Sequence, residues 1–332
     1  MPQTFRELIA ENKRNSVLLV VVFCLFITVV GMVLGLAIVA SSGATMVRLN
    51  WVEGVLVGVI AGGISLLLSW VGYYAGNDLI LTVSGAKPIA HNDDPELFNV
   101  VEEMAIAAGI PMPSVYLIHD RAPNALATGR DPQHAAVAIT TGLRSKLTRD
   151  ELQGVLAHEV SHIRNYDIRL MLLMAVLVGT IVMMCDFFWQ LLRWGPSSSR
   201  RNGKGSGAIV LVILVIAIIL AILAPLLAQL IQFAVSRQRE YLADASAVEL
   251  TRFPQGLANA LKKIDDDPAE LATANRGTAH LYIANPIKKF EERAHTPFAS
   301  HPPIKDRIRR LEALMHDRSG RYRVEGTSRN DA

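Results

Sequence analysis

Four long apolar runs limit this 332-residue chain to folds that place helices in lipid. The first two runs contain no charged side chain, and the third carries only Arg169 and Asp186. Each run is long enough to cross about 30 Å of hydrocarbon. Because a helix satisfies its own backbone polar groups inside lipid, we predict four transmembrane helices. They cover residues 17–40, 55–74, 168–192 and 208–235.

Composition agrees with a membrane protein. Hydrophobic residues make up 51% of the chain, and the mean hydropathy of +0.30 is high for a soluble protein. A net charge of +3 without a basic stripe excludes nucleic acid as a partner. Cys24 and Cys185 both lie inside apolar runs, which favours packing roles over a disulfide.

Charges at the ends of the runs predict an orientation. Arg6, Lys13 and Arg14 precede the first run, and the next loop is nearly neutral, so we expect a cytoplasmic N-terminus. The basic loop 193–207 would then lie outside, against the positive-inside rule. The topology of this loop therefore stays open.

Glycines four residues apart recur in the first two runs. This spacing permits close helix crossings or a dimer face, but glycine is also simply common in membrane helices. Both interpretations stay open for Gly31 and Gly35, Gly58 and Gly62, and Gly72 and Gly76.

Polar stretches between the runs predict a small mixed domain. Asp94 and Pro95 are typical of a helix start, and Gly109 of its end. Thr148 and Glu151 form a capping box that opens another helix. We expect strands at 114–118 and 135–141 with a loop at 121–132 between them, helices at 236–250, 254–264 and 304–316, and a disordered tail from 317.

The sequence His158-Glu159-Val160-Ser161-His162 lies on the helix that follows the capping box. Histidines four residues apart share one face of a helix and can bind a single cation. Glu159 then lies near that face, where it can accept a proton from water activated by the metal. The motif alone is also compatible with an ordinary charged surface helix. We expect this helix to continue almost unbroken into the third apolar run.

Zinc needs a third protein ligand beside the two histidines, and we expect one ion per chain. Glu240 is the best candidate, since it lies on a predicted helix with Asp244 one turn later. A carboxylate in the position of Asp244 can orient a ligating histidine. The ligand types favour zinc over other divalent metals.

Residues 79–314 resemble the HtpX-type membrane zinc metalloproteases, which are related to the CAAX-prenyl proteases. Leu126 replaces the phenylalanine usual in the family, a change that concerns local packing. The matching motifs lie at 123–129, 137–143, 158–167, 239–244, 279–286 and 300–303, with Arg307.

The resemblance implies a mainly α membrane protein with a small α+β zincin-type (gluzincin) domain. It implies His158, His162 and Glu240 as zinc ligands and Glu159 as catalytic base. Related proteases suggest His301 and Arg307 as stabilisers of the oxyanion. From the residues alone, a proline-flanked turn for His301 and an exposed helix cation for Arg307 stay equally open. The resemblance further implies a multi-pass protein of the bacterial inner membrane with a cytoplasmic catalytic domain, which clears misfolded membrane proteins under stress.

The predicted spans divide the rest of the chain into separate segments. We expect a cytoplasmic N-terminal segment 1–16, a catalytic domain in two parts, 79–167 and 236–316, and a tail 317–332. Asn124 and the strand with Ala135, Val137 and Ile139 are expected to hold the substrate as an added strand, because backbone pairing suits an unfolded chain.

Other functions compete with general degradation. A dedicated processing protease would share every residue of this site, so the sequence leaves the substrate range open. A catalytically silent scaffold is disfavoured because the base and all three ligands are present, and a transporter because few charges lie in the spans. The expected partners are unfolded membrane proteins and the lipid bilayer. Homo-oligomerisation stays open.

Overall fold

The computed structural model describes residues 5–41, 51–194, 215, 218–219, 237–272, 278–284, 286 and 302–316. The protein is mainly helical with one small mixed sheet, as predicted. In chain order the elements are α1 (Phe5–Ser41), α2 (Trp51–Val83), β1 (Ala86–Pro88), α3 (Pro95–Ala108), β2 (Ser114–Ile118), β3 (Ala125–Gly129), η2 (Pro132–His134), β4 (Ala135–Thr140), α4 (Thr141–Lys146), α5 (Arg149–Arg164), α6 (Asp167–Trp194), α8 (Arg237–Thr251), α9 (Pro254–Asp266), η3 (Ala279–Leu281) and α10 (Ile304–His316).

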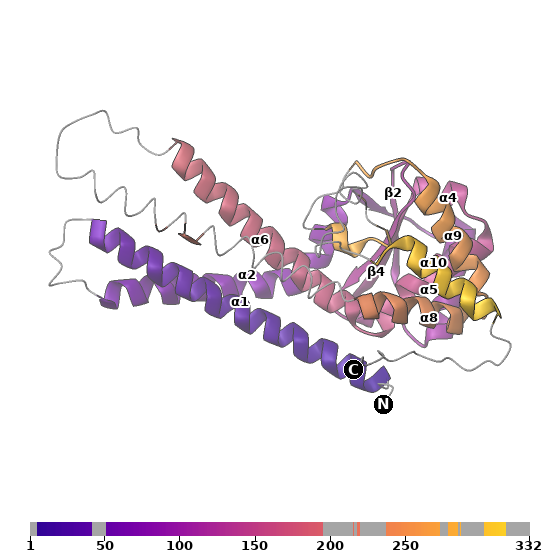
Figure 1. Ribbon diagram of the computed structural model, residues 1–332, viewed down its shortest axis with the longest axis horizontal. Coiled ribbons are helices and arrows are strands. Elements are labelled where there is room, and N and C mark those ends of the chain that lie inside the picture. The colour runs from indigo at the N-terminus through magenta and orange to yellow at the C-terminus, as the bar shows by residue number, and fades with distance from the viewer. Residues whose placement is uncertain are drawn as a thin grey trace, which may run out of the picture.

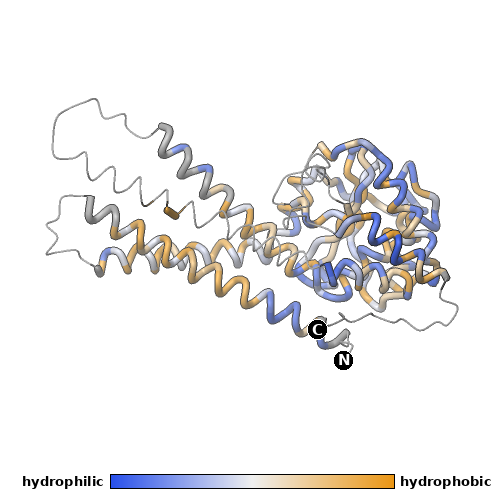
Figure 2. Tube along the Cα trace, viewed as in Figure 1, coloured by the Kyte–Doolittle hydropathy of each residue, from blue (hydrophilic) through white to orange (hydrophobic). Residues whose placement is uncertain are grey.

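Three long helices, α1, α2 and α6, extend from one side of a compact body that holds the sheet and the shorter helices (Figure 1). Two of them are long and apolar enough to cross a membrane, over Ile9–Leu36 and Val52–Val83. Only 28% and 22% of these apolar windows are buried, so the helices are not the core of a soluble domain. Their apolar residues form long stretches outside the body (Figure 2).

The other two predicted spans are less fully described. Residues 168–192 lie within α6, which is helical throughout. The run 208–235 lies outside the described residues, apart from Val215, Ile218 and Ile219. The described part of the chain thus supports a membrane protein, and the count of four spans stays a prediction.

Glycines allow the long helices to approach closely. A Cβ added at Gly58 of α2 would lie 2.9 Å from the Thr28 backbone oxygen of α1. One added at Gly72 would lie 2.5 Å from the Val176 side chain of α6. The close-crossing interpretation of the glycine spacing is therefore right for these helices.

The sheet has the strand order β1-β2-β4-β3. β4 pairs parallel with β2 and antiparallel with β3, and β1 pairs antiparallel with β2. The strands at β2 and β4 are confirmed, whereas β3 lies in the segment that we predicted to be a loop. Helices α3, α5, α8, α9 and α10 contribute to one apolar core with the sheet.

Local signals set the ends of several helices. Asp94 caps α3 by accepting from the Leu97 N–H, and Gly109 ends the helix in the left-handed region. Thr148 and Glu151 form the predicted capping box of α5. The helices predicted at 236–250, 254–264 and 304–316 are confirmed as α8, α9 and α10, and the predicted tail lies outside the described residues.

Helix α5 leads almost unbroken into α6, as expected. Only Asn165 and Tyr166 form a turn between the two helices. Tyr166 has a φ of 61°, in the left-handed region that interrupts a right-handed helix. The turn redirects the chain at the boundary between the body and the long helices.

Candidate active site

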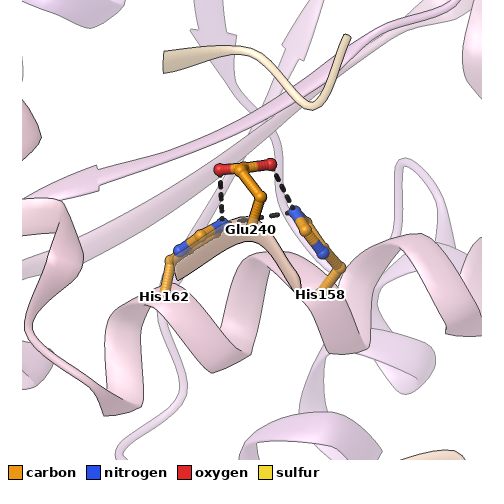
Figure 3. A group of neighbouring side chains, drawn as sticks. All are labelled: His158, His162 and Glu240. Carbon is orange, nitrogen blue, oxygen red and sulfur yellow. Dashed lines mark hydrogen bonds and ion pairs between the residues drawn. The ribbon is translucent and has the colours of Figure 1, made fainter. Parts of the chain in front are cut away.

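Helix α5 carries the His-Glu-x-x-His sequence through the middle of the body. Every residue from Gly154 to Ile163 is buried. The helix packs so closely on α9 that a Cβ added at Gly154 would lie 2.5 Å from the Leu257 backbone nitrogen. His158 and His162 lie one turn apart and face the same way (Figure 3). Their positions are therefore fixed by a rigid and well-packed element.

Glu240 reaches the same place from α8. Its carboxylate points between the two imidazoles (Figure 3) and is buried, with 2% of the residue exposed. Its Oε2 lies 3.7 Å from His158 Nε2 and its Oε1 3.6 Å from His162 Nε2. The two Nε2 atoms are 3.2 Å apart.

This arrangement fits a tetrahedral cation. All three ligand atoms lie within 4.8 Å of one another. Ligands about 2.0–2.1 Å from zinc at tetrahedral angles are about 3.3 Å apart, close to the spacing seen here. Two imidazoles and one carboxylate also form a donor set that leaves a fourth position for water in catalytic zinc sites. The residues present therefore fit a zinc ion.

A carboxylate stands behind each histidine. Asp167 Oδ2 lies 3.0 Å from His162 Nδ1, and Asp244 Oδ1 lies 3.0 Å from His158 Nδ1. In the tautomer with its proton on Nδ1, each histidine donates to its carboxylate and keeps the Nε2 lone pair free to face the metal position. Asp244 lies where the predicted orienting carboxylate would be. For Asp167 the sequence leaves open whether it supports the histidine helix or caps the next span, and its contact with His162 favours the first.

Burial and these charges shift the pKa values of both histidines. Burial, with the charge of Arg307, lowers the pKa of His158 to about 4. Burial also disfavours a charged His162, but the hydrogen bond to Asp167 and the charge of Glu240 outweigh it and raise its pKa to about 9.

Glu159 lines the same pocket as the three ligands. It is buried, with 2% exposed, and burial raises the pKa of its carboxyl to about 7. The Ala127 N–H of β3 donates to this carboxylate. Glu159 is thus held between the ligands and the edge of the sheet, where a base for an attacking water belongs.

Arg307 lies behind the ligands and not on the pocket wall. Its guanidinium binds Asp244 at two points, Nε to Oδ2 at 2.9 Å and Nη2 to Oδ1 at 2.7 Å. Nη1 donates to the Ile283 carbonyl at 2.8 Å, and the residue is fully buried. This geometry supports a role in positioning Asp244, and the oxyanion role stays a prediction. His301 lies outside the described residues.

Residues 278–284 close one side of the pocket. Tyr282 forms an antiparallel bridge with Leu126, and the Ile283 N–H donates to the Ala125 carbonyl at 2.9 Å. The segment thus pairs with the outer edge of β3. Together with the ligands and Glu159, the pocket is lined by Ala127, Met171, Leu281, Tyr282 and Ile283.

The predicted substrate strand needs correction. Ala135, Val137 and Ile139 belong to β4, which pairs on both sides and has no free edge for another strand. The edge beside the site is β3. Asn124 does not face the pocket, because its side chain donates to the Ala284 carbonyl at 3.1 Å. It holds the 278–284 segment against the sheet.

Comparison with known proteins identifies the family. The model of peptidase family M48 matches residues 91–315. The chain is 43% identical over 314 residues to "Protease HtpX homolog" of Thermoanaerobacter pseudethanolicus, covering 94% of this chain and 98% of the relative. It is 41% identical over 314 residues to the protein of the same name from Listeria monocytogenes serotype 4a. This match covers 93% of this chain and 99% of the relative.

A structure comparison finds the crystal structure of S. mikatae Ste24p. The two are 18% identical with a TM-score of 0.46, over 83% of this chain and 61% of that one. With a family model over most of its length and relatives similar from end to end, this chain belongs to peptidase family M48 and is a zinc metallopeptidase of the membrane.

Proposed function

We propose that this enzyme is an endopeptidase that cleaves misfolded or damaged membrane proteins as part of quality control under stress. The observation that carries the proposal is the convergence of His158, His162 and Glu240, with Glu159 in the same pocket, at the base of apolar helices. A dedicated processing protease remains the alternative for the same site.

In this proposal His158, His162 and Glu240 hold one zinc ion per chain. A bound zinc ion supplies a Lewis acid that activates water and polarises the scissile carbonyl. Glu159 accepts the proton of the attacking water and delivers it to the leaving amine. Asp167 and Asp244 keep both histidines in the tautomer that binds metal, and Arg307 holds Asp244.

The substrate binds as an extended strand along β3. Ile283 and Tyr282 already pair with Ala125 and Leu126, so the part of this edge that a substrate would extend begins at Ala127, beside Glu159. Pairing through the backbone selects an extended conformation more than a particular side chain. Folded proteins seldom expose such a segment, which is why unfolded chains are the favoured substrate class.

The membrane placement follows from the helices. We propose that α1, α2, α6 and residues 208–235 all span the inner membrane of a bacterium, with the two parts of the catalytic domain in the cytoplasm. Lys13 and Arg14 at the body end of α1 support this orientation. The metal position lies close to the start of α6, so the reaction takes place near the membrane surface.

Cleavage of an unfolded membrane protein by the detergent-purified enzyme tests the proposal. Glu159→Gln should lower kcat by about 10²–10⁴-fold, because it removes the base, while zinc stays bound. Glu102→Gln, an exposed change on α3, is the matched control and should cleave as the wild type does. Chelation should abolish cleavage, and added zinc should restore it.

Equal cleavage by wild type and Glu159→Gln would contradict the assignment of the base. Comparison of the unfolded substrate with the same protein in its folded state tests the substrate class. Faster cleavage of the unfolded form supports quality control. Cleavage at one bond irrespective of folding would instead identify a processing protease.

A further inference from the structure

Asn12 connects the N-terminal helix to the metal-site residues. It lies on α1 just before the apolar run, yet only 6% of the residue is exposed. Its side-chain Nδ2 donates to Asp167 Oδ1 at 2.7 Å and to the Asn165 carbonyl at 3.0 Å. Both protons of the amide are therefore used on the turn that joins α5 to α6.

Asp167 links Asn12 to His162, one of the proposed metal ligands. Asp167 uses Oδ1 for Asn12 and Oδ2 for His162 Nδ1, which is 3.0 Å away. Only 1% of Asp167 is exposed, so its carboxylate depends on protein partners. A carboxylate anchored at one oxygen keeps the other in a fixed place, and the imidazole of His162 is fixed with it.

We propose that Asn12 is a positioning residue for the metal centre. It anchors Asp167 so that His162 presents Nε2 to the ion, and thereby makes zinc affinity depend on the docking of α1. The proposal rests on the function proposed above, because it takes His162 as a ligand. The contact joins the first membrane helix directly to the chemistry of the site.

Residues next to Asn12 also connect α1 to the turn between α5 and α6. The turn held by Asn12 contains Tyr166 in the left-handed region, and the Lys13 Nζ lies 4.3 Å from the centre of the Tyr166 ring. Two successive residues of α1 thus contact the same short turn. Ser16, one turn further along α1, donates to the Asn12 carbonyl at 2.8 Å.

Zinc affinity of the full-length enzyme in detergent, measured by competition with a chelator, tests the proposal. Loss of an outer partner of a metal-ligating histidine typically weakens binding by about 10–100-fold, and we expect Asn12→Ala to lie near the lower limit. Asn15→Ala, at a partly exposed position on the same helix, is the matched control and should bind as the wild type does. Asn12→Asp keeps the shape but removes the donors, and it should also weaken binding.

A double-mutant cycle separates positioning from a purely structural role. If Asn12 acts through Asp167, then Asn12→Ala should add no further loss of zinc affinity in an Asp167→Asn background. Additive losses would overturn the proposal, as would an unchanged affinity in Asn12→Ala. Glu240→Ala tests the site itself. If it binds zinc as tightly as the wild type does, the proposed ligand set is wrong, whatever Asn12 does.

Discussion

At the scale of single residues, the site is built from buried charges that fix one another. Asp244 accepts from Arg307 at both oxygens and also lies beside His158 Nδ1. Burial alone would raise the pKa of Asp244, but the charge of Arg307 and the contact with His158 outweigh it and lower the pKa. The ionised Asp244 carboxylate is thus stabilised by both Arg307 and His158. A buried carboxylate needs such a partner, which explains why Arg307 is fully buried behind the metal site.

This dependence predicts the effect of changes at Arg307. Arg307→Lys keeps the charge but loses the two-point contact with Asp244, and we expect a loss of about 1–3 kcal/mol in the free energy of unfolding. Arg307→Ala leaves Asp244 without its counterion and should cost about 3–5 kcal/mol. Thermal unfolding of the zinc-loaded variants measures both. A stable, zinc-loaded Arg307→Lys enzyme with a strongly reduced kcat would instead favour the oxyanion role.

At the scale of elements, the helix that carries the ligands is stabilised at its start. Glu151 accepts from the Thr148 N–H at 2.8 Å and from Lys263 Nζ of α9 at 2.6 Å. Although burial opposes it, these contacts hold the pKa of Glu151 below its ordinary value. The ionised carboxylate therefore stabilises the fold at neutral pH, and this contribution disappears as the pH falls through the lowered pKa.

Glu151→Gln should accordingly destabilise the protein by about 1 kcal/mol at pH 7. The difference from the wild type should shrink as the medium becomes acidic, because the wild-type carboxylate is then protonated as well. Unfolding measured at pH 7 and at several lower pH values checks this. Glu103→Gln removes an exposed pair with Arg149 and should cost less than about 1 kcal/mol. A constant difference at every pH would argue against the ionised cap.

Helix packing in the membrane gives a second prediction at this scale. Gly58→Ala forces a methyl group against the α1 backbone and should cost about 1–3 kcal/mol. Gly63 lies on the same helix with no atom within 4 Å of an added Cβ. Gly63→Ala should therefore be tolerated in thermal unfolding of the detergent-solubilised protein. Equal effects of the two changes would show that α1 and α2 do not pack through Gly58.

These elements also show what the sequence can reveal. The caps of α3 and α5 and the spacing of the histidines are local patterns, so they are predictable from a few neighbouring residues. Strand β3 was missed because its five residues include a glycine and two alanines and lie between Pro123 and Pro132, so the segment resembles a loop more than a strand. The contacts of Asn12 with Asp167 and of Arg307 with Asp244 join distant parts of the chain, and no local pattern records them.

At the scale of the whole molecule, the site combines residues that lie before and after α6 in the sequence. His158 and His162 precede α6, and Glu240 follows it on α8. Arg307 comes later still, and Asn12 comes from the other end of the chain. The site therefore requires the two parts of the catalytic body and the first helix to be assembled together. A cation at this place would connect α5 to α8 and stabilise that assembly.

Removal of zinc should for this reason lower the stability of the entire body. Binding at 100 to 1,000 times Kd stabilises a folded protein by about 2.7–4.1 kcal/mol. For a body of this size, chelation should lower the Tm on the order of 5–15 °C. Glu240→Ala should show no zinc-dependent shift, since it lacks a ligand. Glu249→Ala, an exposed change on the same helix, should keep the full shift. A zinc-dependent shift that persists in Glu240→Ala would place the ion elsewhere.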